Sequence, residues 1–326
     1  MIKQRSLAFI KTNLGMIIIV SALIALLLVG GLVNASFLTF NHIVDIMYLN
    51  TMFGILAIAQ TIVILAGGID MSVGAVYWVT IMLGSHYMNG DKLFTGILYV
   101  LAIGIAVGLI NGVCIAKLKI PYVVATMAMM IILTGVLYVV TGGGGHGKAP
   151  EALHDFSIAR LPAVGGSRGL PIRVLLWLAL TAIMAFSLNK TTFGWTVRAL
   201  GSNPAATRYC GLRGDFSLIL VYVISSVFAV IAGLLYMGQA GTPYPSFEGG
   251  VGVGTGITME TIAAVIVGGT FFTGGKGGFI NTFLGILILS TLYSLLSMAG
   301  MGENTRSILN GVIILAVVAL YSRNKD

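Results

Sequence analysis

The stretch LAGGIDMSVG, residues Leu65–Gly74, lies between two long apolar runs and carries a single acid, Asp70. Its glycines interrupt the apolar pattern. A charged side chain at the centre of a bilayer costs ~2.5–3.5 kcal/mol on insertion scales, and chains that retain one usually place it on a pathway or in a water-filled cavity. We therefore predict that Asp70 lines a membrane pathway or shapes its inner gate. The alternative is that Asp70 only caps the helix that follows it.

The composition of the chain is that of a membrane protein. Apolar residues make up 57% of it and charged residues only 9%, with a mean hydropathy of +1.01. Soluble domains contain ~25% charged residues, so this chain has too few polar groups to cover a surface in water. We predict an all-α, polytopic integral membrane protein in which residues 1–326 form a single transmembrane domain.

The apolar runs predict about ten membrane spans. Two assignments are weak, because the glycine break separates the second span from the third and the eighth span is short for a full crossing. The predicted spans are 14–33, 43–66, 72–88, 94–116, 121–140, 172–188, 215–237, 258–270, 279–298 and 306–321.

The net charge of +8 indicates orientation rather than nucleic-acid binding, because no basic run is interleaved with aromatic residues. With a cytoplasmic N-terminus, 12 of the 18 Lys and Arg residues lie on the cytoplasmic side and 6 outside. Cytoplasmic loops are enriched in Lys and Arg. We therefore expect both termini in the cytoplasm, a cytoplasmic loop at 189–214 and an external loop at 141–171.

The glycine break has a second copy near the other end of the chain. VILAGGIDMSVG at 63–74 aligns with AVIVGGTFFTGG at 264–275, which predicts an internal repeat. On the span count the copies run parallel, and one miscounted span would make them inverted; chance in a chain with 44 glycines is the alternative. Interrupted hydrophobic segments in a polytopic chain point to a transporter. The candidate pathway or gate residues are Gly67, Gly68, Asp70, Ser72, Gly74, Gly268, Gly269 and Thr273.

A short helix is predicted inside the cytoplasmic loop. Asn203 is a good N-cap, Pro204 suits the first helical position, and Gly211 can end the helix. The small residues Ala205 and Ala206 would let this helix sit close in a groove of a soluble subunit. We predict a docking segment at Asn203–Gly211, the alternative being an ordinary surface loop.

Three glycines, Gly104, Gly108 and Gly112, recur every fourth residue of the fourth span. This spacing allows close approach of another helix, either within the chain or from a second subunit.

The sequence indicates no catalytic residues, no metal site and no cofactor. GGGGHGKA at 142–149 nearly fits a phosphate-binding loop, but Ala149 replaces the hydroxyl that would hold Mg²⁺, and no strand precedes it. The four histidines are too scattered for a metal site. Energy for active transport must therefore come from a partner or an ion gradient.

Three segments together resemble the permease subunits of bacterial ABC monosaccharide importers, the group that carries ribose, xylose, galactose or allose. They are LAGGIDMSVGA, RALGSNPAATRYCGL and IAAVIVGGTFFTGGKGGFINTFLGI, and the resemblance spans nearly the whole chain. Met71 and the pair Tyr209–Cys210 depart mildly from the family pattern. The resemblance implies a homodimer or heterodimer of permeases, a separate cytoplasmic ATPase and a periplasmic sugar-binding protein. It also implies that Asn203–Gly211 is the loop that meets the ATPase.

Two functional hypotheses follow. The first is a non-enzymatic importer permease that forms the translocation pathway for a monosaccharide. The alternative is an ion-coupled secondary transporter of a small polar solute, with Asp70 and Glu260 as titrating or ion-binding groups. An intramembrane enzyme is disfavoured.

Overall fold

The computed structural model describes residues 2–88, 92–142, 144–163, 168–241 and 254–302, and the isolated residues 305, 308, 309, 311, 312 and 315; for residues 2–14 it describes the backbone alone. Within these residues the chain is helical, and one isolated bridge joins Arg160 to Pro171. The predicted all-α class is therefore confirmed.

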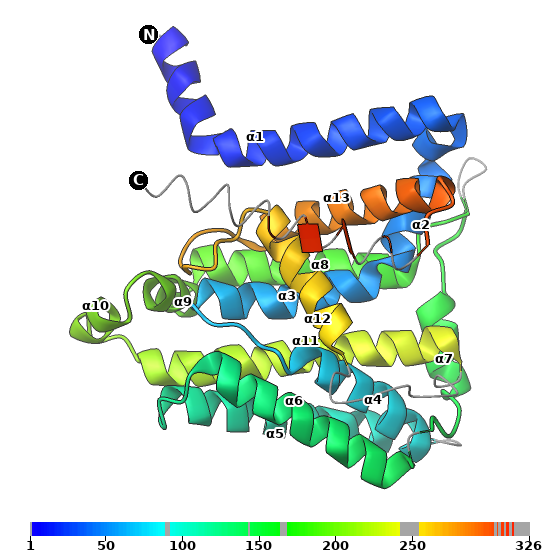
Figure 1. The fold of residues 1–326 in the computed structure, drawn as a ribbon, viewed down its shortest axis with the longest axis vertical. Helices are drawn as coiled ribbons and strands as arrows, with labels where there is room; N and C mark the ends of the chain where they lie inside the picture. The colour runs from blue at the N-terminus through cyan, green and yellow to red at the C-terminus, as the bar shows by residue number, and fades with distance from the viewer. Residues whose placement is uncertain are drawn as a thin grey trace.

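Six helices are long and apolar enough to cross a membrane, and they run roughly parallel or antiparallel to one another (Figure 1). Their apolar residues surround the whole helix, which is the pattern of segments that face lipid or other helices on every side. They are α1 (Ile2–Val33), α5 (Leu93–Ala116), α6 (Tyr122–Thr141), α8 (Ile172–Lys190), α11 (Gly214–Ala240) and α13 (Phe279–Met298).

A bent pair of helices is long and apolar enough to form a seventh crossing if the two helices count as one span. α2 (Phe40–Leu49) and α3 (Thr51–Leu65) meet at Asn50 with an angle of 55°. The side-chain amide of Asn50 donates to the carbonyl of Ile46 at 2.8 Å, so the bend has a polar residue at its corner.

Two further helices are too short to span. α4 (Val73–Tyr87) has 15 residues and α12 (Thr255–Val267) has 13, which gives lengths of roughly 20–23 Å against a hydrocarbon core of ~30 Å. The prediction of about ten spans is therefore not confirmed, and the described residues contain six spans, or seven with the bent pair. The predicted span 306–321 lies almost wholly outside the described residues.

Short helices mark the two ends of the bundle. α9 (Thr192–Ser202) and α10 (Pro204–Tyr209) lie at one end, together with the N-terminal end of α1, and α7 (Glu151–Ile158) lies at the other (Figure 1). A short 3₁₀ turn, η1 (Ala35–Leu38), joins α1 to α2. We call these ends of the molecule the α10 end and the α7 end.

α11 is the central helix and packs against α3, α4, α5 and α7. The three glycines of α5 face it. A Cβ on Gly108 would lie 2.6 Å from Cα of Val223, and a Cβ on Gly112 would lie 2.7 Å from Cα of Ile219. The predicted close approach is therefore confirmed and occurs within the chain.

The internal repeat is not confirmed. α3 ends with Gly67 at φ +84° and α12 ends with Gly269 at φ +78°, and the same pair of backbone hydrogen bonds closes each helix. The aligned sequences match Gly67 with Gly268 instead, one residue out of step. Gly211 and Gly300 end helices in the same way, so this shared helix terminus does not support a duplicated unit, and the repeat stays a prediction.

Candidate functional site

The carboxyl group of Asp70 is buried and fully hydrogen-bonded. Its Oδ1 accepts from the backbone N–H of Ser72 at 2.9 Å and from the Ser72 hydroxyl at 2.6 Å, and its Oδ2 accepts from the Ser225 hydroxyl at 2.9 Å. All three partners donate to this carboxyl group, which accounts for both of its oxygens. Asp70 therefore fixes the backbone turn that precedes α4, and its role as a pathway residue or as a helix cap stays a prediction.

Other helices hold this break in place. The amide of Asn111 in α5 donates to the Ser72 hydroxyl at 2.9 Å, and the amide of Gln60 in α3 donates to the carbonyl of Asp70 at 2.6 Å. The backbone N–H of Met71 donates to the Thr126 hydroxyl of α6 at 3.1 Å. The break between α3 and α4 is therefore fixed by α3, α5, α6 and α11.

The two short helices begin next to each other. The N–H of Gly74 donates to the Thr258 hydroxyl at 3.1 Å, and a Cβ on Gly74 would lie 2.7 Å from the carbonyl carbon of Gly254. Only glycine permits this approach of α4 to α12.

A second glycine contact, at the α10 end, joins three segments that are far apart in the sequence. The N–H of Gly275 donates to the carbonyl of Leu65 at 2.9 Å. A Cβ on Gly201 of α9 would lie 2.5 Å from N of Gly275 and 2.9 Å from Cα of Gly274. We call this contact of Leu65, Gly201, Gly274 and Gly275 the glycine junction. Gly67 lies beside it, where a Cβ would lie 3.4 Å from Cα of Gly201.

The remaining gate candidates lie near the ends of α3 and α12. Gly68 faces the buried Tyr222 hydroxyl, Gly268 packs on the first turn of α13, and Thr273 is exposed. The structure therefore divides the predicted gate residues between the Asp70 break and the α10 end.

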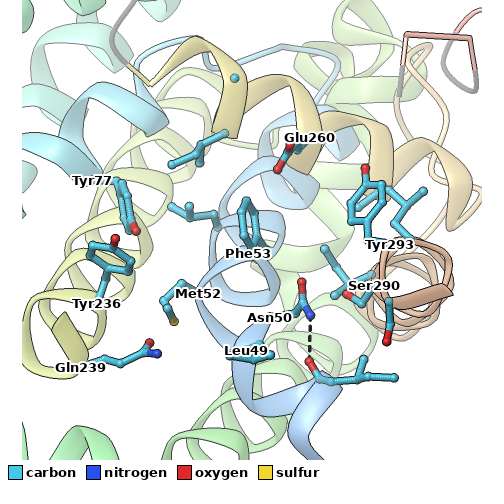
Figure 2. Close-up of a pocket in the computed structure, with 18 of the residues that line it drawn as sticks. Leu49, Asn50, Met52, Phe53, Tyr77, Tyr236, Gln239, Glu260, Ser290 and Tyr293 are labelled. Atoms are coloured by element: carbon cyan, nitrogen blue, oxygen red, sulfur yellow. Dashed lines mark hydrogen bonds between the residues drawn. The ribbon is translucent and has the colours of Figure 1, made fainter. Parts of the chain in front are cut away.

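A cavity of about 850 Å³ lies among α2, α3, α4, α11, α12 and α13 (Figure 2). It begins at α2, towards the α7 end, and reaches the start of α12 at Gly254. None of the predicted gate residues lines it, and neither do the described residues of α9, α10, 66–72 or 268–278. Its walls combine aromatic and polar side chains, including Phe53, Tyr77, Trp78, Tyr236, Tyr293, Asn50, Gln239, Glu260 and Ser290.

One cluster of aromatic side chains in the cavity wall comes from α4 and α11. The ring centroids of Tyr77 and Trp78 are 5.7 Å apart, those of Tyr77 and Tyr236 are 5.8 Å apart, and those of Trp78 and Tyr236 are 6.4 Å apart. Small-molecule sites are typically such apolar and aromatic clefts with a few placed polar groups.

A buried arginine supports the polar wall. Arg173 of α8 is 0% exposed, and its guanidinium carbon lies 3.3 Å from the ring centroid of Tyr48. One nitrogen donates to Oε1 of Gln239 at 2.6 Å and another to the carbonyl of Tyr48. Gln239 is therefore held by α8 while it lines the cavity.

Two ion pairs lie beside the cavity at the α7 end. Asp45, which lines the cavity on α2, pairs with Arg160 at 3.3 Å and with Arg168 at 3.4 Å. These contacts tie the segment after α7 to α2.

The predicted docking helix is present as α10. Oδ1 of Asn203 accepts from the N–H of Ala206 at 3.0 Å, Pro204 begins the helix, and Gly211 has φ +70°. The helix is exposed, with Tyr209 at 92%. The capping prediction is therefore confirmed, whereas its role in docking stays a prediction.

The cavity residues were not predicted from the sequence, except for Glu260 as an ion-binding candidate. Glu260 lines the cavity and Asp70 does not, so the two acids that the ion-coupled hypothesis invokes lie in different environments. Among the described residues, no three His, Cys, Asp or Glu side chains group closely enough to hold a metal ion.

Comparison with known proteins identifies related chains. Residues 42–318 match the family described as branched-chain amino acid transport system / permease component. The ribose import permease protein RbsC of Escherichia coli (strain K12) is 30% identical over 311 residues, which cover 93% of this chain and 92% of that protein. The autoinducer 2 import system permease protein LsrC of Escherichia coli (strain K12 / DH10B) is 29% identical over 303 residues, which cover 93% and 85%. No solved structure matches the chain significantly.

Proposed function

The chain belongs to the family of branched-chain amino acid transport system permease components, and from this premise we propose that it is the transmembrane subunit of an ABC importer for a monosaccharide. The ribose permease relatives support the substrate class. A transport permease of this kind is not itself an enzyme. The ion-coupled alternative is not favoured, because the relatives are import permeases and the two acids do not share a site.

The observation that carries this proposal is the cavity. Residues of α2 line the cavity on the side of the α7 end. At the α10 end, the glycine junction packs three backbone segments closely together. In the proposed transport cycle, sugar enters the cavity from the α7 end. It leaves after the segments around Gly67, Gly268 and Gly269 separate. Asp70 contributes by fixing the start of α4 rather than by touching the sugar.

The proposed orientation places the α10 end in the cytoplasm, with both termini. The α7 end and segment 141–171 then face the periplasm, where a sugar-binding protein docks. The exposed α10 meets the ATPase, and a second permease subunit completes the complex. This orientation rests on the excess of Lys and Arg in the predicted cytoplasmic loops.

The change Ala206→Glu tests the proposed function. Ala206 is exposed at the third position of α10, where a glutamate favours the helix N-terminus and leaves the cap intact. Buried against a partner, the same glutamate would be a desolvated charge. We expect the ATPase to co-purify poorly with this variant and sugar uptake to fall, while the permease reaches the membrane at normal levels.

Ala152→Glu is the matched control, because Ala152 is an exposed helical alanine of α7 at the opposite end. It should leave ATPase co-purification unchanged. Full ATPase association and full uptake in Ala206→Glu would place the docking site elsewhere. Proton-driven sugar uptake by the chain without partners would overturn the importer assignment itself.

A further inference from the structure

The side-chain amide of Gln239 is held in one orientation at the cavity wall. Because Arg173 donates to its Oε1 at 2.6 Å, Nε2 with its two N–H groups is the end of the amide that remains for a ligand. Gln239 lies on the last turn of α11, and Figure 2 shows its side chain extending toward the cavity. This position therefore offers a hydrogen-bond donor.

Arg173 is an unusual neighbour for an amide. Its side chain is fully buried, and no described carboxylate lies within ion-pair distance of it. Burying an unpaired cation carries a large desolvation penalty. Among the described residues, Tyr48 offsets it by its ring and its carbonyl, and Gln239 by its amide oxygen. Because one nitrogen of Arg173 donates to the amide oxygen of Gln239, this bond fixes which atom of the amide faces the cavity.

Asn50 provides the opposite polarity. Its Nδ2 donates to the carbonyl of Ile46 at 2.8 Å, which leaves Oδ1 as the atom for a ligand. Figure 2 shows this bond, with the amide oxygen directed to the other side, and Asn50 lines the cavity. The bend between α2 and α3 therefore presents a hydrogen-bond acceptor.

The remaining wall disfavours anionic ligands. The described lining residues include the acids Asp45 and Glu260 and contain no Lys or Arg. The nearby Arg160 and Arg168 pair with Asp45, so a sugar phosphate or sugar acid would find no unpaired cation among the lining side chains, whereas the hydroxyl groups of a neutral sugar can both donate and accept. The aromatic side chains supply apolar contact around these polar groups.

We propose that Gln239 and Asn50 are substrate-binding residues of the permease itself, which hold hydroxyl groups of a neutral monosaccharide in the cavity during passage, with Arg173 as the positioning residue of Gln239. This inference rests on the proposed importer function. After the binding protein releases the sugar, the permease then selects it a second time through hydrogen bonds from fixed side chains.

The decisive variant is Gln239→Glu in the complete importer, reconstituted in vesicles with its ATPase and binding protein. Glutamate still accepts from Arg173, so a purely structural contact survives, but it offers no N–H to the sugar. The readout is labelled sugar translocated per ATP hydrolysed, measured with the best-transported member of a panel of D-ribose, D-xylose, D-galactose and D-allose. We expect this ratio to fall about 3- to 10-fold, which corresponds to the loss of one net hydrogen bond.

Monodeoxy forms of the same sugar identify the contact. In the wild type, one deoxy analogue should show the same fall in the ratio, and in Gln239→Glu that analogue should show no further fall. Arg173→Met should likewise transport the parent sugar and that deoxy analogue at the same ratio, because the amide of Gln239 can then rotate. If it does not fold, Gln239→Glu alone decides.

Asn50→Leu and Asn189→Leu form a matched pair, because leucine is similar in size to asparagine and has no oxygen to accept a hydrogen bond. Asn189 makes the same amide-to-carbonyl bond within its helix, to Ala185 at 2.9 Å, but does not line the cavity. We expect only Asn50→Leu to lower the ratio. An unchanged ratio for neutral sugar in Gln239→Glu, with wild-type uptake intact, would overturn this inference but not the proposed function. Absence of wild-type uptake for every sugar of the panel would overturn both.

Discussion

The change Gly201→Ala should open the glycine junction. A Cβ at this position would lie closest to the carbonyl oxygen of Leu65, 2.5 Å from N of Gly275 and 2.9 Å from Cα of Gly274. Ordinary contact begins at 3.4 Å, so the Gly275 segment must move away by about 0.9 Å. All three neighbours are backbone atoms, which no side-chain rotation can move aside.

The cost of this overpacking is about 1–3 kcal/mol, which corresponds to about a 5- to 150-fold change in an equilibrium constant. The cost falls on the state in which the junction is closed and leaves an open state unaffected. Alanine favours the helix over glycine by up to ~1 kcal/mol, so any loss arises from the contact and not from the stability of α9.

Two measurements test this reasoning. Sugar uptake by the reconstituted importer should fall by up to the same factor. A cysteine at Ser290, in a background without Cys114 and Cys210, should become reactive to an impermeant reagent applied from the α10 end. Gly135→Ala is the control, because nothing lies within 4 Å of a Cβ at that helical position. Wild-type uptake and labelling in Gly201→Ala would refute the role of the junction as a closed gate.

Three further predictions follow from other sites. Asp70→Asn should keep normal membrane levels but reduce uptake, because it removes the charge that three donors surround; unchanged uptake in transport assays would leave Asp70 as a helix cap only. Gly108→Leu should lower the melting temperature of the purified protein, at a cost of about 1–3 kcal/mol or more, whereas Gly135→Leu at an open position should not. In whole cells without native cysteines, a cysteine at Asp155 should react with an impermeant reagent and one at Ser202 should not; the reverse pattern would invert the proposed orientation.

The sequence predicts local features of this chain well and its long-range geometry poorly. The caps of α10 follow from Asn203, Pro204 and Gly211, because capping depends on neighbouring residues only. The number of spans does not follow, since hydropathy cannot distinguish a crossing helix from a half-length one such as α4.

The cavity was missed for the same reason. Its residues come from six helices and form no motif, and Gln239 lies just beyond a predicted span. One usable signal was present, because the predicted span 43–66 contains two side-chain amides, Asn50 and Gln60, and Asn50 lines the cavity. The partner of Gln239 could not be read from sequence, because Arg173 lies 66 residues away along the chain.

The meeting of α4 and α12 at Gly74 and Gly254 has an electrostatic consequence. The N-terminus of each helix carries roughly half a positive charge from its aligned peptide dipoles, so the two adjacent ends together present about one unit of positive charge inside the membrane. The carboxyl group of Asp70, just before α4, accepts three hydrogen bonds, and no described basic side chain pairs with it. Separating α12 from α4 would break the hydrogen bond from the Gly74 N–H to the Thr258 hydroxyl and leave both groups without this partner in a medium of low dielectric. The two half-length helices are therefore expected to move as one body when the pathway opens.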